Sequence, residues 1–212
     1  MTQVVESSES DFAGKSSALQ CTFLSFYRAA VLLNPDPNSI LGLIKTTAGS
    51  NGSAALFSSA RNNSFTPVSN AFDCPLTTAY VNPGICDYAP NVFTSTCGLD
   101  TGFHLTIRPY PALLNAFRFA TGSGGANADP LNITIEGSNQ PASDLLRGSS
   151  WRLIYNGSTG LSNVSSRAMF GNMRYLSNNS NWFSSYRVLV TATPSFNNAV
   201  EYGGVELYGY YY

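Results

Sequence analysis

Apolar and polar residues alternate with a period of two in several short runs of this 212-residue chain. In GFHLTIRP, residues 102–109, the apolar side chains share one face of an extended backbone, and His104, Thr106 and Arg108 share the other. This period is typical of a half-buried β-strand. The same alternation recurs in NAFRFATG (115–122), PLNITIEG (130–137), SWRLIYNG (150–157), YRVLVTAT (186–193) and GGVELYG (203–209). The side chains that we expect to close the core include Phe103, Phe119, Ile133, Leu153, Val188 and Leu207.

Clusters of Gly, Pro, Asn and Ser separate these runs, and no helical periodicity lies between them. Many short strands joined by such turns predict an all-β protein, specifically a jelly-roll β-sandwich. The loop TGSGGANAD (121–129) consists almost wholly of small residues, which let the backbone turn between two strands without steric cost. We therefore interpret this loop as a connection between strands.

The start of the chain differs from the rest. Residues 1–17 are polar and acidic, residues 19–33 are apolar, and NPDPN at 34–38 ends the apolar segment with two prolines. Periodicity does not separate helix from strand in this apolar segment. We divide the chain into an N-terminal apolar arm, residues 1–37, and one β-sandwich domain, residues 38–212.

Composition argues against some classes of partner. Only 11% of the residues are charged and the net charge is −1, so the chain has no positive field for a nucleic acid or an anionic bilayer. The longest apolar stretch, residues 18–33, is interrupted by Gln20 and Arg28, and no stretch is long enough for a membrane span. The long acidic segment before that stretch does not resemble a signal peptide.

The cysteines and the glycosylation sequons favour an extracellular, cell-surface or virion-surface location. The four cysteines are Cys21, Cys74, Cys86 and Cys97. Because the chain has no CxxC pair and a single histidine, disulfides are a better interpretation than a zinc site, and three pairings are open. The six N-x-S/T sequons, a slight excess over chance, begin at Asn51, Asn62, Asn132, Asn156, Asn163 and Asn178.

Aromatic and donor side chains near loops are the candidates for ligand binding. A sugar is bound by an aromatic ring packed on its C–H face, together with a few fixed polar groups. Trp182 lies in a polar segment just before a predicted strand, although its ring could instead cap the core. His104 and Arg108 place two donors on one strand face, which is otherwise a solvated face, and Arg174 offers a planar guanidinium. We expect Trp151, in contrast, to pack in the core.

The inventory of reactive side chains argues against an enzyme. His104 is the single histidine and no serine lies in a GxSxG motif. Of the 12 acidic residues, five lie in the arm, at its exit or near the C-terminus, which leaves few for a pair of catalytic carboxylates. We assign no catalytic residue.

Six segments occur in a characteristic order: SNAFDCPLTTAYVN (69–82), TGFHLTI (101–107), FRFATG (117–122), ADPLNITIEGSN (128–139), WRLI (151–154) and GGVELYG (203–209). In this order they resemble the galactose-binding-domain-like superfamily, which includes discoidin or coagulation-factor C-type modules and many carbohydrate-binding modules. The resemblance implies a jelly-roll sandwich with neighbouring termini and a binding surface made by loops at one end. It also implies binding of a sugar or a surface rather than catalysis.

The chain departs from this superfamily at two places. Relatives commonly have an acidic residue and an arginine in the loop that ends at Asp129, but Asp129 alone remains here. Asp129 is therefore a candidate ligand, and we expect that ion pairing does not hold this loop. Relatives also bind a structural calcium ion through carbonyls, an Asp and a Glu. Asp73 matches the Asp, whereas Gly204 stands in place of the Glu, so Asp73 is the candidate calcium ligand and no other cofactor is expected.

We expect a non-catalytic carbohydrate-binding or adhesion module whose partner is a glycan or a glycosylated surface. The alternative is a structural subunit of a surface filament, coat or virion that self-assembles through its N-terminal arm. An exposed apolar arm would be an adhesive patch, and it could add to a sheet edge of a neighbouring subunit.

Overall fold

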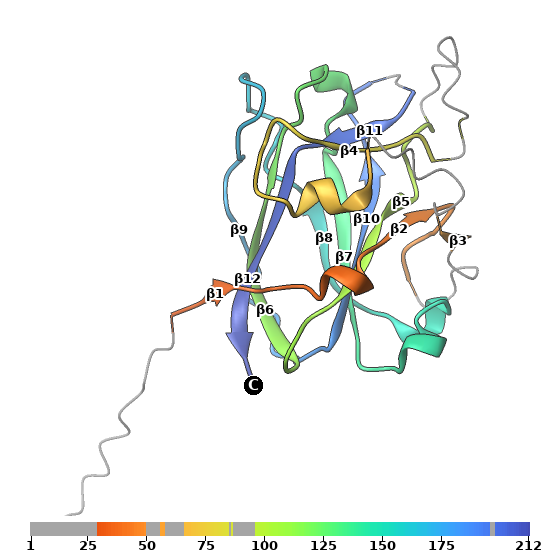
Figure 1. Cartoon of the computed structure of the whole chain (residues 1–212), viewed down its shortest axis with the longest axis vertical. Helices are drawn as coiled ribbons and strands as arrows, with labels where there is room; N and C mark the ends of the chain where they lie inside the picture. The colour runs from red at the N-terminus through yellow and green to blue at the C-terminus, as the bar shows by residue number, and fades with distance from the viewer. Residues whose placement is uncertain (1–28, 50–55, 58–65, 85, 87–95, 196–197) are drawn as a thin grey trace, which may run out of the picture.

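The computed structural model describes residues 29–49, 56–57, 66–84, 86, 96–195 and 198–212. Within them the regular structure is β-strand and short 3₁₀ turns (Figure 1), which confirms the all-β prediction. The strands are β1 (Val31–Leu32), β2 (Leu41–Ile44), β3 (Leu56–Phe57), β4 (Tyr80–Asn82), β5 (Thr101–Thr106), β6 (Ala112–Ala120), β7 (Asn132–Ser138), β8 (Arg152–Ser158), β9 (Arg174–Tyr175), β10 (Ser185–Ala192), β11 (Val200–Tyr202) and β12 (Gly204–Tyr211). The 3₁₀ turns are η1 (Pro37–Ser39), η3 (Val68–Ala71), η4 (Ala126–Ala128), η5 (Ala142–Asp144) and η6 (Gly148–Ser150).

The strands form two main antiparallel sheets. One has the strand order β1-β12-β6-β9 and the other has the order β3-β2-β5-β10-β7-β8, while β11 pairs with β4. A single cluster of buried side chains draws from both main sheets, so the two sheets pack face to face as a β-sandwich. In Figure 1, β12 and β6 lie on one side of the molecule, and β7, β8 and β10 lie on the other.

The core confirms the predicted alternation at five of the six positions. Side chains at most 2% exposed are Phe103, Phe119, Ile133, Val188 and Leu207. They come from five strands of both sheets, and each contributes about 1.5–3 kcal/mol through the burial of its apolar surface.

The prediction that Leu153 lies in this core is wrong, because its side chain is 53% exposed. The register between β7 and β8 shifts by one residue: Ile135 lies opposite Tyr155, whereas Glu136 lies opposite Leu153. Residues that lie opposite each other share a face of the sheet, and Glu136 belongs to the face away from the core, so Leu153 turns outward. Ile154 is the extra residue of this bulge and packs against the core.

The loop 121–129 connects β6 to β7 as expected, but the prediction that ion pairing does not hold it is wrong. Arg167 donates two hydrogen bonds to the carboxylate of Asp129, at 2.6 and 2.7 Å. Glu201 accepts a hydrogen bond from the backbone of Gly124 at 2.7 Å, and a Cβ at Gly124 would lie 2.2 Å from this carboxylate. Arg167 lies 38 residues beyond Asp129 in the sequence, so a search within the loop misses the pair.

The described cysteines form one disulfide. Cys86 is bonded to Cys97, with their Cα atoms 5.4 Å apart. The prediction of a disulfide at Cys74 is wrong for the described residues, since Cys74 is an exposed free thiol in the turn that follows η3. Cys21 lies outside the described residues.

Part of the N-terminal arm belongs to a sheet. Val31 and Leu32, which form β1, pair with β12 at the edge of the four-stranded sheet. This pairing places the start of the described chain beside the C-terminal strand (Figure 1), in line with the neighbouring termini that the resemblance implies. The rest of the arm, residues 1–28, lies outside the described residues, and the division at residue 37 stays a prediction.

Four sequon asparagines are exposed: Asn132, Asn156, Asn163 and Asn178. Asn51 and Asn62 lie outside the described residues, and glycosylation of all six stays a prediction. In the part of the chain that the structure describes, no helix has the length and apolar character needed to cross a membrane.

Candidate functional site

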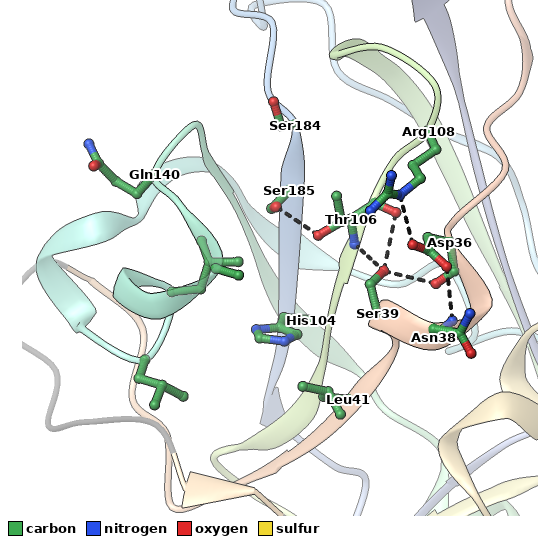
Figure 2. A pocket seen from close by; sticks show the side chains of 13 residues that line it. Asp36, Asn38, Ser39, Leu41, His104, Thr106, Arg108, Gln140, Ser184 and Ser185 are labelled. Carbon is green, nitrogen blue, oxygen red and sulfur yellow. Dashed lines mark hydrogen bonds and ion pairs between the residues drawn. The ribbon is translucent and has the colours of Figure 1, made fainter.

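A pocket opens on the outer face of the six-stranded sheet, where β5 ends and β10 begins. Its volume is about 650 Å³, which is typical of small-molecule sites. Segments far apart in the sequence build it, including residues 36–41, the end of β5 and residues 140–146 (Figure 2). The period of two that buries Leu105 in the core turns His104 and Thr106 toward this pocket.

An ion pair and a capped turn form one wall (Figure 2). The Asp36 carboxylate accepts a hydrogen bond from the backbone N–H of Asn38 at 3.0 Å, and it lies 2.7 Å from Nε of Arg108. The Ser39 hydroxyl donates to the carbonyl of Asp36 at 2.8 Å and accepts from the backbone N–H of Thr106 at 2.8 Å. An aspartate at the N-cap followed by proline favours this turn, because the carboxylate accepts from a free N–H and the ring fixes φ.

His104 forms the floor of the pocket. Its side chain is buried, with 7% exposed. Burial, together with the positive charge of Arg187, lowers the pKa of His104 from 6.5 to about 4. At neutral pH the imidazole is therefore uncharged, with one donor nitrogen and one acceptor nitrogen, and it adds no positive charge to the pocket.

A buried ion pair supports this floor from the neighbouring strands. Arg187 on β10 donates to Glu136 on β7 at 2.7 Å, and their side chains are 1% and 0% exposed. The other oxygen of Glu136 accepts from the backbone N–H of Gly49 at 2.7 Å. The Trp151 ring covers the guanidinium at 4.8 Å, and its indole N–H donates to the carbonyl of Leu145. Trp151 is buried as predicted, but on this outer face of the sheet rather than between the two sheets.

The opposite wall combines apolar and polar groups. Leu145 and Leu146 contribute aliphatic surface, and Gln140 contributes a side-chain amide. Between the walls, the hydroxyls of Ser185 and Thr106 lie 3.1 Å apart (Figure 2). The pocket therefore offers hydroxyl, amide and aliphatic surface side by side.

The structure brings two of the five predicted ligand residues together. His104 and Arg108 both line the pocket. Trp182 does not line it and lies two residues before Ser184, which does. Asp129 lies before the start of β7, at the far end from the pocket, where Arg167 occupies its carboxylate. Arg174 lies on β9, in the other sheet.

Sequence reasoning missed Asp36, Ser39, Gln140 and Ser185, which line the same pocket. The motif DPNS (36–39) is typical of a capped turn, so the sequence does indicate a turn at Asp36 and Ser39. Ser185 lies on the outer face of β10, one residue before the alternating run YRVLVTAT (186–193). Gln140 had no signal, because its position depends on the turn that follows β7.

The candidate calcium ligand Asp73 lies in an exposed turn and accepts from the Thr78 hydroxyl at 2.9 and 3.0 Å. Across the described residues, no three His, Cys, Asp or Glu side chains gather as a metal site. One carboxylate and one hydroxyl fall short of the roughly six to eight oxygen ligands of calcium. The described side chains at Asp73 therefore do not fit the ion by themselves, and calcium binding there stays a prediction.

No protein-family model and no curated protein sequence matches this chain. Solved structures do match its fold. The fucolectin from striped bass (Morone saxatilis) serum has a TM-score of 0.51 and 8% identity, over 85% of this chain and 50% of that chain. Truncated AlyQ contains family 32 carbohydrate-binding (CBM32) and alginate lyase domains. It has a TM-score of 0.50 and 11% identity, and the match covers 86% of this chain and 34% of that chain. The family 32 module of Clostridium perfringens NanJ, in complex with galactose, has a TM-score of 0.49 and 8% identity. The match covers 84% of this chain and 99% of that chain.

At these identities the likeness concerns the fold alone. The chain has a β-sandwich fold similar to that of the fucolectin and of AlyQ, which agrees with the fold that the sequence resemblance implies.

Proposed function

We propose that this protein is a non-catalytic carbohydrate-binding module and that its pocket holds a sugar. The observation that carries the proposal is a pocket of about 650 Å³ with almost no net charge. Asp36 and Arg108 are paired with each other, and His104 is neutral at physiological pH. Such a pocket suits a neutral, hydroxyl-rich ligand better than an ion.

The pocket contains both polar groups that can bind sugar hydroxyls and aliphatic groups that can pack on the C–H face of a sugar. Its side-chain amide, hydroxyls and guanidinium can exchange hydrogen bonds with sugar hydroxyls, while Leu41 and Leu145 offer aliphatic surface for the C–H face. Each such hydrogen bond contributes about 0.5–1.5 kcal/mol net, because it replaces bonds to water. The bonds that Ser39 makes to Asp36 and Thr106 fix one wall in advance, which lowers the entropic cost of binding.

We place the activity outside a cell, at a cell surface or on a virion surface, where glycans are accessible. The Cys86–Cys97 disulfide supports an oxidising compartment. The exposure of the four described sequon asparagines is compatible with glycosylation there. The same surfaces are those on which an adhesion module acts.

A glycan array followed by calorimetry with each hit tests the proposal. Gln140 is exposed and lines the pocket, so Gln140→Ala is expected to fold normally and to weaken sugar binding at least fivefold. Asn172→Ala is the matched control, since this exposed amide lies near the other end of β6, and it should bind within twofold of wild type. An array without a hit, or equal binding by the Gln140→Ala variant, would contradict the proposal.

A second candidate function follows from β1, in which Val31 and Leu32 are exposed on an edge strand. Edge strands present unpaired backbone groups that another chain can extend. As the alternative, we propose a structural subunit of a filament, coat or virion that assembles through its N-terminal arm. Deleting residues 1–28 keeps Leu33, which is in the core. Native mass spectrometry should then show an oligomer for the full chain and a monomer for the truncated chain, and equal oligomeric states would exclude this role.

A further inference from the structure

We propose that the ligand is an oligosaccharide whose chain leaves the pocket past Ser184 and packs on an aromatic pair formed by Trp182 and Tyr212. This inference rests on the proposed sugar-binding function and deepens it. It makes these two side chains a second subsite, separate from the pocket that holds the first sugar residue.

The segment before β10 joins the two subsites. Ser184 lines the pocket, whereas Phe183 is buried in the core. Phe183 pairs with Ala112 at the start of β6, and the chain bends at Ser184 before β10 begins, so this short segment leads from the end of the four-stranded sheet to the pocket. Two residues of chain span at most about 7 Å, which is the scale of one sugar residue. A ligand that fills the pocket therefore reaches the indole within one or two further residues.

A side-chain amide holds this segment in place. Asn139 donates to the carbonyl of Trp182 at 2.8 Å and accepts from the backbone N–H of Ser184 at 2.8 Å. Asn139 directly precedes Gln140, which lines the pocket. The wall of the pocket and the backbone of the aromatic subsite are thus fixed by the same residue.

The two rings form a preorganised surface. Trp182 and Tyr212 make an edge-to-face contact, with centroids 5.7 Å apart and an interplanar angle of 86°. The Tyr212 backbone N–H donates to the carbonyl of Pro111 at 3.1 Å, so the chain end is attached to the loop after β5. Tyr212 is nevertheless 83% exposed. Rings held in this way lose little entropy when a sugar ring packs on them.

Polar groups lie beside this surface, as sugar recognition requires. Arg152 donates to the side-chain carbonyl of Asn181 at 3.3 Å, and Asn181 directly precedes Trp182. Tyr110, next to Pro111, exposes a third aromatic ring on the same loop. The surface therefore combines aromatic faces with an amide and a guanidinium, in continuity with the pocket.

The test measures affinity against ligand length by calorimetry. The probes are galactose, xylose, mannose and glucose, each as the free monosaccharide and as β-1,4-linked oligomers of two to four residues. We expect at least one series to bind, with affinity rising about tenfold or more from monosaccharide to trisaccharide. Trp182→Ala should lower trisaccharide affinity about tenfold, which corresponds to about 1.4 kcal/mol, and leave monosaccharide affinity within twofold.

Further variants separate binding from folding. Tyr212→Ala changes a residue that is 83% exposed, so the variant should fold as wild type does and lose several-fold in trisaccharide affinity only. Tyr175→Ala is the control, because this tyrosine is 73% exposed on β9 and pairs with Ala116 in the middle of β6, whereas Tyr212 lies beside Pro111, before β6 begins. Equal affinity for all ligand lengths, or an equal loss for monosaccharide and trisaccharide in the Trp182→Ala variant, would overturn the second subsite while leaving the pocket proposal intact. Absence of binding by any sugar would overturn both.

Discussion

Burial of His104 is expected to make the stability of the protein depend on pH. The pKa of His104 is about 4 in the folded protein, because of burial and the nearby charge of Arg187, and about 6.5 in the unfolded chain. Between these values the unfolded chain binds a proton that the folded protein does not. The contribution of His104 to the free energy of unfolding is therefore fully present above pH 6.5. It decreases as the pH falls from 6.5 toward 4. The full difference corresponds to about 3 kcal/mol.

The comparison of wild type with His104→Gln isolates this effect, because glutamine keeps polar groups but does not titrate. The charged groups around the ring are Arg187 and Glu136 on the same sheet, and Asp36 and Arg108 across the pocket. Both proteins contain all four, so the two proteins differ only in the residue at position 104. Urea denaturation at pH 7.5 and 4.5 should show that wild type loses about 2–3 kcal/mol more than the variant. Equal losses would refute the assignment of a neutral, buried His104.

Three further predictions concern the fold. Glu136→Gln leaves a buried arginine without its counterion and should cost about 3–5 kcal/mol in urea denaturation; an unchanged midpoint would argue against the buried pair. Leu153→Ser should change stability by no more than about 0.5 kcal/mol, whereas Phe119→Ala should cost about 3–5 kcal/mol, and the reverse order would show that the β7–β8 register is wrong. Reducing the Cys86–Cys97 bond should lower stability by about 2–4 kcal/mol, and identical melting curves with and without reductant would disagree with this.

The inward-facing residues of most strands were predictable because burial of one face imposes a period of two on the sequence itself. Phe103, Phe119 and Val188 follow this rule. Leu153 does not, because a bulge depends on the register with the neighbouring strand and leaves no trace in the alternation of a single strand. Asp129 illustrates the same limit, since its partner Arg167 comes from another connection.

The candidate site was predictable only where one strand carried it. His104 and Arg108 stood out together because both lie on the polar face of a single predicted strand. Asp36 and Gln140 join them only through the pairing of β2, β5, β10 and β7, which brings four distant segments to one end of a sheet. The burial of His104 could not be predicted from the alternation, which marks this face of the sheet as solvated. In the structure, Trp151 and the turns before it cover this face.

The central claim is that the pocket on the outer face of the six-stranded sheet binds a sugar. Titration of the ¹⁵N-labelled protein with the tightest-binding oligosaccharide, followed by backbone amide chemical shifts, tests it most directly. The account predicts the largest shifts at Thr106, Gln140 and Ser185, with smaller shifts at Trp182. Shifts confined to the loop 121–129, at the far end of the sandwich, would contradict it.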